Sequence, residues 1–240
     1  MQEKFSRFIS LVGEEGFNNI VDSNVIVFGI GGVGGHVVDA LIRSGLGKIT
    51  IVDSDNVEES NLNRQLVASL NTIGRSKVDV MKEHILSINP DCKVKAIKKL
   101  YLPSNEDEFD LSEYDYIVDA IDNVSAKISL ICMAKTLQKP IISALGAGNK
   151  LDPTKLEVSD IYKTSVDPLA KVLRHELRKR NINSLKVVYS KEEPIKVDIK
   201  DDKRRGTPGS SSFVPSSMGL IIASEVIKTL LCNSSKKDIK

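Results

Sequence analysis

The sequence predicts an α/β fold in which a mostly parallel sheet has helices on both faces and is extended by C-terminal strands and helices. Three observations predict it. Strand-like and helix-like patterns alternate along the chain, the strand-like segments are short apolar runs, and a glycine-rich turn joins the first run to a helix. With 240 residues and 41% hydrophobic composition the chain can bury one sizeable core, so we expect one domain over residues 1–240.

The N-terminal part of the chain supplies most of the expected elements. Apolar runs predict the strands, and apolar residues at helical spacing predict the helices between them. We expect strands over residues 24–29, 48–53, 93–98, 116–120 and 140–145. We expect helices over residues 35–44, 75–89 and 123–137, the last of them ended by Lys139-Pro140.

The pattern changes after Gly146-Ala147-Gly148. Strands are expected over 155–162 and 185–189, with a helix between them that begins at Asp167-Pro168, because Asp is a good N-cap and Pro suits the first helical position. Residues 190–212 are rich in Lys, Asp, Gly and Ser and predict a mobile basic loop before the last helix. We interpret residues 149–240 as an extension of the same sheet.

The last apolar stretch, residues 218–231, is the only candidate for a membrane span in the sequence. It has 14 residues and contains Glu225 and Lys228, whereas a span needs about 20 apolar residues. We therefore expect a packed C-terminal helix and no membrane span.

Charge and cysteine content exclude several classes of protein. Lys and Arg number 34 against 32 Asp and Glu, so neither a nucleic-acid coat nor an acidic tail is indicated, and any basic site must be local. Cys92, Cys132 and Cys232 are odd in number and far apart, which argues against a disulfide framework and against a zinc site. With no visible secretory signal, a reducing, cytoplasmic location is expected.

The glycine-rich turn predicts a nucleotide site. Gly29, Gly31, Gly32 and Gly34 follow a strand of β-branched residues and open a helix, which places backbone N–H groups and the positive end of the helix dipole at one point. Asp53 ends the next strand, where a ribose hydroxyl would be met. The alternative is a purely structural turn. Residues 23–148 thus form an expected Rossmann-like nucleotide-binding core, preceded by a helical segment over 1–22.

Charges downstream of the glycine turn favour ATP over NAD. A triphosphate carries more negative charge than a dinucleotide pyrophosphate and needs cations or a metal around it. Asp122 could hold Mg²⁺ at the end of the strand over 116–120. The other polar candidates are Asp55, Asn61, Arg64, Gln65, Lys77 and Asn123. Each has an ordinary alternative: a surface charge for Arg64, a first-turn helix residue for Lys77, a helix N-cap for Asp122.

In their joint order these residues resemble the ubiquitin-activating-enzyme-like (ThiF/MoeB/HesA) superfamily, which includes the adenylating enzymes of thiamin and molybdopterin synthesis. The resemblance covers nearly the whole chain. It implies that Asp53 binds the ribose, that Arg64 and Lys77 contact phosphates and act in catalysis, and that Asp122 coordinates Mg²⁺. It also implies that Asp55, Asn61 and Gln65 line the site, and that in a homodimer Arg7 reaches the partner's ATP. An exposed helix charge is the alternative for Arg7.

The cysteines narrow the reaction. In several relatives a cysteine beyond the central strands attacks the adenylate and forms a thioester with a ubiquitin-like protein, but residues 146–231 of this chain contain no cysteine. Cys132 falls on an apolar helix as an expected core thiol, and only Cys232 is plausibly exposed, which leaves a sulfur-relay role open for it. The activated carboxylate is then expected to be attacked from within the same substrate, which amounts to a dehydrative cyclisation.

Further motifs resemble one branch of the superfamily, the tRNA threonylcarbamoyladenosine dehydratases. These motifs are Phe5-Ser6-Arg7 through Gly13-Glu14-Glu15-Gly16, Asp167-Pro168-Leu169-Ala170, the helix over 174–178, Val187-Val188-Tyr189-Ser190, and residues 209–215. The resemblance implies adenylation of the threonylcarbamoyl carboxylate on tRNA, beside the anticodon, followed by cyclisation with release of AMP and pyrophosphate. The alternatives are an adenylyltransferase for a ubiquitin-like sulfur carrier and a non-catalytic nucleotide- or tRNA-binding module. A monovalent cation (Na⁺ or K⁺) and a cysteine desulfurase or sulfur-acceptor partner are left open.

A local basic region offers a place for RNA. Residues 163–205 hold 13 Lys and Arg against 7 Asp and Glu. On the helix after Asp167, Lys171, Arg174 and Arg178 are expected on one face with His175, opposite Leu169, Val172, Leu173 and Leu177. Lys203, Arg204 and Arg205 add charge in the loop. The alternative is a solvated helix face followed by a charged loop.

Overall fold

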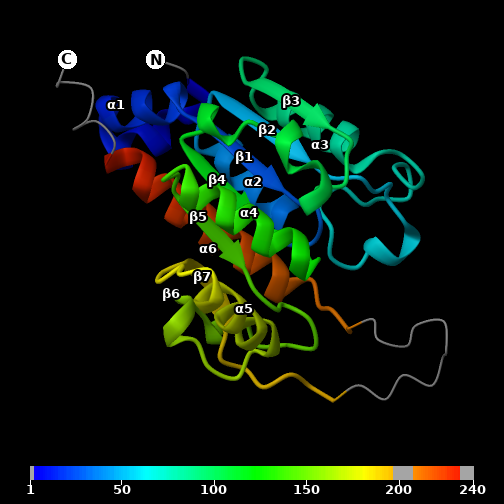
Figure 1. The fold of residues 1–240 in the computed structure, drawn as a ribbon. Helices are drawn as coiled ribbons and strands as arrows, with labels where there is room; N and C mark the ends of the chain where they lie inside the picture. The colour runs from blue at the N-terminus through cyan, green and yellow to red at the C-terminus, as the bar shows by residue number, and fades with distance from the viewer. Residues whose placement is uncertain (1–2, 197–207, 233–240) are drawn as a thin grey trace.

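The computed structural model describes residues 3–196 and 208–232, and its seven strands form one sheet in the order β3-β2-β1-β4-β5-β7-β6 (Figure 1). Every neighbouring pair is parallel except β6 and β7, which are antiparallel. The strands are β1 (Asn24–Phe28), β2 (Lys48–Val52), β3 (Lys93–Ile97), β4 (Tyr116–Asp119), β5 (Ile141–Ala144), β6 (Leu156–Asp160) and β7 (Lys186–Ser190).

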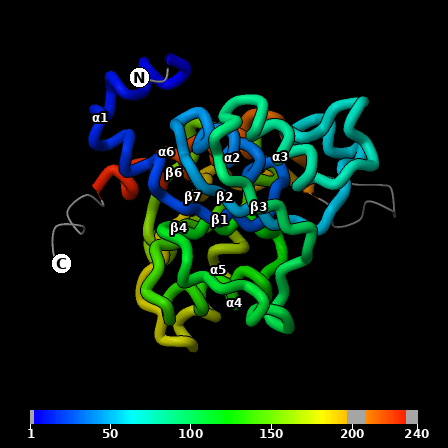
Figure 2. Tube along the Cα trace, turned by 90° about the horizontal axis from the view of Figure 1, so that it is seen from above, coloured from blue at the N-terminus to red at the C-terminus, as the bar shows by residue number. Residues whose placement is uncertain are grey.

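Helices cover both faces of the sheet, as the view from above shows (Figure 2). On one face lie α2 (Gly34–Arg43), α3 (Lys77–Ile88) and α6 (Phe213–Leu231), and on the other lie α4 (Val124–Thr136) and α5 (Pro168–Lys179). The N-terminal α1 (Ser6–Asp22) packs on α6. The predicted fold class, a mostly parallel α/β sheet with a C-terminal extension, is confirmed.

Alternation along β1 explains why the sheet has two cores. Val25 and Val27 point into the core beneath α2, α3 and α6, whereas Ile26 and Phe28 point into the core beneath α4 and α5. All four side chains are at most 1% exposed. A strand buried on both faces reads as a continuous apolar run, which is what residues 25–28 show.

The order in which successive strands are added to the sheet reverses at β1. It passes from β1 to β2 and β3 on one side and then crosses to β4, which pairs with β1 on the other side. The connections after β1 and β4 therefore leave in opposite directions and open a crevice at the carboxyl ends of these strands. Any ligand site of this sheet is expected there.

The C-terminal helix α6 is longer than the apolar stretch 218–231. With its full 19 residues it is long and apolar enough for a membrane span by length and composition alone, and half of its most apolar window is buried inside the protein. Met218, Ile222 and Val226 enter the core against the sheet and α2. Its apolar composition is therefore explained by its place as a core helix.

Candidate active site

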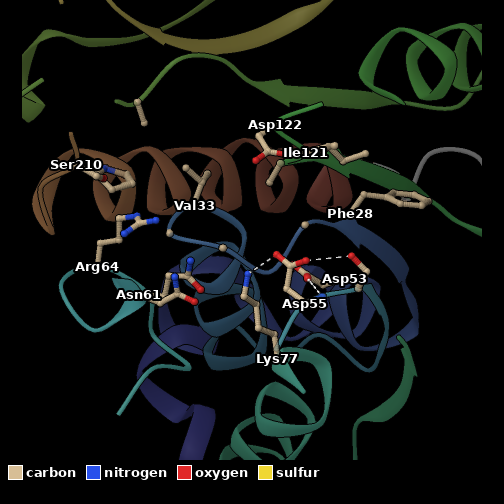
Figure 3. A pocket seen from close by; sticks show the side chains of 18 of the residues that line it. Phe28, Val33, Asp53, Asp55, Asn61, Arg64, Lys77, Ile121, Asp122 and Ser210 are labelled. Atoms are coloured by element: carbon tan, nitrogen blue, oxygen red, sulfur yellow. Dashed lines mark hydrogen bonds and ion pairs between the residues drawn. The ribbon is translucent and has the colours of Figure 1, made fainter. Parts of the chain in front are cut away.

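A cavity of about 460 Å³ opens at the carboxyl ends of β1, β2 and β4, at the point where the strand order reverses (Figure 3). It brings together most of the residues that the sequence predicted for the nucleotide. Those that line it are Gly29, Gly31, Gly32, Asp53, Asp55, Asn61, Arg64, Gln65, Lys77 and Asp122.

The glycine turn is held in a shape that side chains would prevent. Gly29 has a φ of 88°, and a Cβ on it would lie 2.5 Å from the carbonyl oxygen of Ala120. A Cβ on Gly34 would lie 1.8 Å from the Gly29 carbonyl oxygen, so α2 can start only with glycine there. Gly31 and Gly32 line the cavity instead, which lets a ligand approach the backbone closely. Gly34 does not line it and supports the turn from behind.

Asp53 fixes the loop that faces the glycine turn. Its Oδ2 accepts a hydrogen bond from the Ile30 amide at 2.6 Å, and its Oδ1 accepts one from the Asp55 amide at 2.8 Å. A carboxylate has further lone pairs and can accept a hydroxyl group in addition. Asp53 thus joins β2 to the glycine turn and still faces the cavity.

Lys77 begins α3 and points its ammonium group into the cavity. Its Nζ lies 2.8 Å from Oδ2 of Asp55, and its side chain is 7% exposed. Partial burial raises the pKa of Asp55, but the hydrogen bond and charge of Lys77 outweigh it and bring that pKa below its ordinary value. Asp55 is thus held as a carboxylate beside a cation that faces the glycine turn.

Arg64 enters the cavity from the turn after the short 3₁₀ helix Glu59–Asn61. Its NH1 donates to the Ser60 carbonyl at 3.0 Å and to Oδ1 of Asn63 at 2.8 Å. Gln65 is buried beside it, and its Oε1 has no hydrogen-bond partner in the described part of the chain. A buried amide oxygen without a partner is costly, so a donor from a ligand would stabilise this arrangement.

Asp122 is exposed at the cavity edge after β4, whereas Asn123 is the N-cap of α4 and accepts from the Ala126 amide at 3.0 Å. The capping role suggested as an alternative for Asp122 therefore belongs to Asn123, which does not line the cavity. Beneath this turn, Asp119 and Lys127 form a fully buried ion pair of 2.9 Å, and Asp119 also accepts from the Ile121 amide. That pair holds the backbone that presents Asp122.

The wall opposite Asp53 comes from two distant segments, Ala147-Gly148 and residues 208–210. Asn149 joins them: its backbone N–H donates to the Gly209 carbonyl at 2.7 Å, and its Oδ1 accepts from the Gly209 amide at 2.6 Å. The predicted N-cap Asp167 is confirmed, and its Oδ2 accepts from the Gly146 amide next to this wall. Helix α5 is thus anchored beside the cavity.

Comparison with known proteins is consistent with this geometry. The model of the ThiF family matches residues 5–239. The chain belongs to the ThiF family. It is 41% identical over 254 residues to the tRNA threonylcarbamoyladenosine dehydratase of Bacillus subtilis, covering 100% of this chain and 99% of that protein.

Two solved structures of the Escherichia coli tRNA N6-threonylcarbamoyladenosine dehydratase, TcdA, resemble this ThiF-family chain over nearly its whole length. The complex with AMP superposes with a TM-score of 0.90 and the complex with ATP with 0.89. In each, sequence identity is 31%, and the match covers 98% of this chain and 97% of the other. The resemblance to the superfamily and to its dehydratase branch is thereby confirmed.

The residues of this ThiF-family chain that the sequence predicted to contact RNA differ in exposure and in their hydrogen-bond partners. On α5, Lys171 is exposed, Arg178 lies with its guanidinium carbon 5.1 Å from the centre of the Tyr162 ring, and Arg174 donates to the Thr164 carbonyl at 3.1 Å. Val172, expected on the apolar face, is 48% exposed, because Ala170, Leu173 and Leu177 form the buried stripe. The other three predicted residues, Lys203, Arg204 and Arg205, lie outside the described residues.

The remaining predicted residue, Arg7, is exposed on α1 and does not line this chain's cavity.

Cys92 is buried, and burial raises the pKa of its thiol to about 11. Cys132 is half-buried with its pKa raised mainly by burial, and Cys232 is exposed at the end of α6. No cysteine lines the cavity among the residues that the structure describes.

Sequence reasoning missed the apolar side of the cavity and its far wall. Phe28, Leu100, Tyr101 and Ile121 supply the apolar side, and Tyr101 has its hydroxyl pKa raised to about 12 by burial, so it stays uncharged. Leu100 and Tyr101 follow β3, so their place after a strand of the parallel sheet was the available signal. The wall at 208–210 overlaps the motif over residues 209–215, but that motif did not indicate that the segment lines the cavity.

Proposed function

We propose that this chain uses ATP to adenylate the carboxylate of threonylcarbamoyladenosine in tRNA and cyclises it with release of AMP and pyrophosphate. The observation that carries the proposal is the cavity at the point where the strand order reverses. There the glycine turn meets three cationic side chains and four carboxylates: Arg64, Lys77, Lys99, Asp53, Asp55, Glu58 and Asp122. The chain that holds this cavity is similar over its whole length to tRNA threonylcarbamoyladenosine dehydratases.

The cavity has distinct places for the parts of ATP. The apolar side at Phe28 and Leu100 suits the base, and Asp53 suits the ribose hydroxyls. The glycine turn at the start of α2 offers backbone N–H groups and the helix dipole to the phosphates. Arg64 and Lys77 add cations that a triphosphate needs and that a neutral ligand would not.

The reaction begins when a carboxylate oxygen attacks the α-phosphorus and pyrophosphate leaves, which forms a mixed anhydride with AMP. A nucleophilic atom of the same substituent then attacks the carbonyl carbon, the bond to AMP breaks, and the ring closes. One water is lost from the nucleoside, and its oxygen leaves in AMP. Arg64 and Lys77 stabilise the charge that builds on the phosphates. The attacking atom belongs to the substrate, so no protein nucleophile is required.

Mg²⁺ fits the donor set at Asp122. Mg²⁺ is usually held by one or two carboxylates together with phosphate oxygens and water, and Asp122 offers one exposed carboxylate at the cavity edge. When bound, Mg²⁺ would neutralise phosphate charge. In the described residues no group of three or more His, Cys, Asp and Glu side chains comes together to hold a metal by itself. The proposal does not include zinc, and it does not depend on Na⁺ or K⁺.

The tRNA is proposed to reach the cavity past α5. Asp167 links the first turn of α5 to Gly146, beside the cavity wall at Ala147. Lys171 and Arg178 are exposed on this helix, and both can meet phosphates with salt-dependent affinity. Arg174 reaches RNA in this arrangement only if it leaves Thr164, so we assign it the weaker contribution.

We further infer that the protein works as a homodimer in the cytoplasm, where tRNA is its partner. Arg7 is exposed and away from its own cavity, which is what an arginine serving a partner's site requires.

Product analysis with three test molecules distinguishes the proposed function from adenylation of a ubiquitin-like protein. Release of AMP and pyrophosphate is measured with tRNA carrying threonylcarbamoyladenosine, with the same tRNA unmodified, and with a sulfur-carrier protein ending in Gly-Gly. We expect release with the modified tRNA alone. Release or ATP–pyrophosphate exchange with the Gly-Gly protein alone would support the alternative, and ATP binding without AMP from any substrate would indicate a non-catalytic module.

A further inference from the structure

The side chain of Asn63 bridges the nucleotide side and the far wall of the cavity. Its Oδ1 accepts from NH1 of Arg64 at 2.8 Å, and its Nδ2 donates to the Ser210 carbonyl at 2.9 Å. Figure 3 shows Arg64 and Ser210 together at one end of the cavity. A guanidinium needs an acceptor and a carbonyl needs a donor, so only this orientation of the amide satisfies both partners.

On the nucleotide side, the Asn63 bridge leaves two nitrogen atoms of the Arg64 guanidinium available to a ligand. NH1 is occupied by Asn63 and by the Ser60 carbonyl, whereas Nε and NH2 make no hydrogen bond within the described residues. A phosphate can take these remaining donors side by side, in the bidentate geometry that arginine favours. Asn63 and Ser60 thus hold one edge of the guanidinium and direct the other edge to a ligand.

On the opposite side, Asn63 binds the wall at 208–210, which is also held by hydrogen bonds with Asn149. Gly209 exchanges two hydrogen bonds with Asn149, and the Ser211 hydroxyl donates to the Lys150 carbonyl at 3.3 Å. Asn149 itself adopts a φ of 57°, a conformation that asparagine tolerates better than most residues. The wall at 208–210 is therefore held by Asn149 from one end and by Asn63 from the Arg64 end.

We propose that Asn63 is a positioning residue that fixes the position of the Arg64 guanidinium relative to the wall at Ser210. This would bring the phosphates of ATP and the incoming carboxylate together in a geometry suited to reaction. The inference rests on the proposed function, in which the tRNA enters past α5, beside the wall that Ala147-Gly148 and residues 208–210 form. Small misplacements of bound groups lower rates strongly. Asn63 itself does not line the cavity, so it offers ATP no direct contact. Asn63 is therefore expected to affect turnover with tRNA more than ATP binding.

Three variants separate this role from a structural one. Asn63→Ala removes both hydrogen bonds, Asn63→Gln keeps an acceptor and a donor on a longer side chain, and Asn71→Ala is the matched control. Asn71 is exposed on the same stretch and makes no hydrogen bond in the described part of the chain. Because Asn63 is also exposed, none of the variants should disturb folding.

The experiment measures the Kd of ATP alone, kcat and KM with modified tRNA, and amide hydrogen exchange of residues 208–216. For Asn63→Ala we expect kcat/KM to fall about tenfold or more while the Kd of ATP changes by less than about threefold. Exchange at residues 208–216 should become faster, because the wall loses one anchor. Asn63→Gln should recover part of the loss, and Asn71→Ala should match the wild type.

The outcomes separate this inference from the proposed function. An active wild type in which Asn63→Ala and Asn71→Ala have the same kcat/KM overturns the inference and leaves the function standing. Equal exchange in those two variants overturns it as well, and this readout requires no activity. A wild type that binds ATP but does not act on modified tRNA contradicts the proposed function, whatever the exchange data show.

Discussion

The Nζ atom of Lys77 lies 2.8 Å from Oδ2 of Asp55, an ion pair that joins the first turn of α3 to the loop after β2. The two partners differ in exposure, since the Lys77 side chain is 7% exposed and that of Asp55 is 62% exposed. Water can therefore hydrate Asp55 while Lys77 keeps its place in the cavity. A phosphate entering the cavity can share the ammonium group without leaving a buried carboxylate unpaired.

Replacing Lys77 by methionine should remove function without unfolding the protein. We expect Lys77→Met to raise the Kd of ATP and to lower tRNA-dependent turnover by about a hundredfold, the usual size of the effect when a transition-state charge contact is lost. Lys82→Met, at an exposed position of the same helix, is the control. Isothermal titration, steady-state rates and thermal unfolding measure these effects. Wild-type turnover in Lys77→Met would remove the phosphate role of this residue.

Two glycines of the same turn should respond differently to alanine. A Cβ on Gly34 would sit 1.8 Å from the Gly29 carbonyl oxygen, whereas a Cβ on Gly31 meets nothing closer than 4.0 Å. We expect Gly34→Ala to destabilise the fold by about 2 kcal/mol or more, because the backbone must shift. Gly31→Ala should keep wild-type stability in denaturant unfolding but bind ATP more weakly, since its methyl group occupies the cavity. Equal stability of the two variants would contradict the packing described for Gly34.

The cysteines should differ in reactivity, and none should be needed for turnover. Thiolate is the reactive form, and burial raises the pKa of the Cys92 thiol to about 11, so this group stays protonated and inert at pH 8. Iodoacetamide labelling followed by mass spectrometry should modify the exposed Cys232 first and Cys92 last. Cys232→Ser should retain tRNA-dependent AMP release. Loss of activity in Cys232→Ser, with the fold intact, would point to a covalent relay through this residue.

Arg7 is predicted to act on the partner subunit's ATP. Arg7→Ala and Asp122→Asn should each be inactive as homodimers, but a mixture should regain activity, because a heterodimer holds one site with both native residues. Mixing followed by a rate assay and by measurement of subunit exchange checks this. If the mixture stays inactive although heterodimers form, Arg7 does not complete a partner's site.

Residues at strand ends were the ones that sequence reasoning located best. Asp53 and Asp122 follow β2 and β4, and Lys77 opens α3, so the alternation of strands and helices places all three at one edge of the sheet. Parallel strands bring their carboxyl ends together, and the chain order is then enough to predict a shared cavity. The sequence analysis considered Asp122 as the helix cap, whereas the structure gives this role to Asn123; both residue types cap well, so residue type alone does not separate them.

Contacts between segments distant in sequence were not visible. Asn149 and Asn63 hold the wall at 208–210 beside the cavity through hydrogen bonds to its backbone, and backbone partners leave no pattern in a sequence. Arg174 is similar: helical spacing places it on a polar face, but its bond to Thr164 depends on how the segment before α5 folds back. The residue type of an apolar cavity residue such as Leu100 does not distinguish it from a residue of the hydrophobic core.

The most direct test of the central claim is nucleoside mass spectrometry after incubation of the protein with ATP, Mg²⁺ and tRNA carrying threonylcarbamoyladenosine. We expect the modified nucleoside to lose the mass of one water, only when ATP is present, and AMP to appear in equal amount. Lys77→Met should leave the nucleoside unchanged. Persistence of the open nucleoside with wild-type protein that is folded and binds ATP would contradict the account.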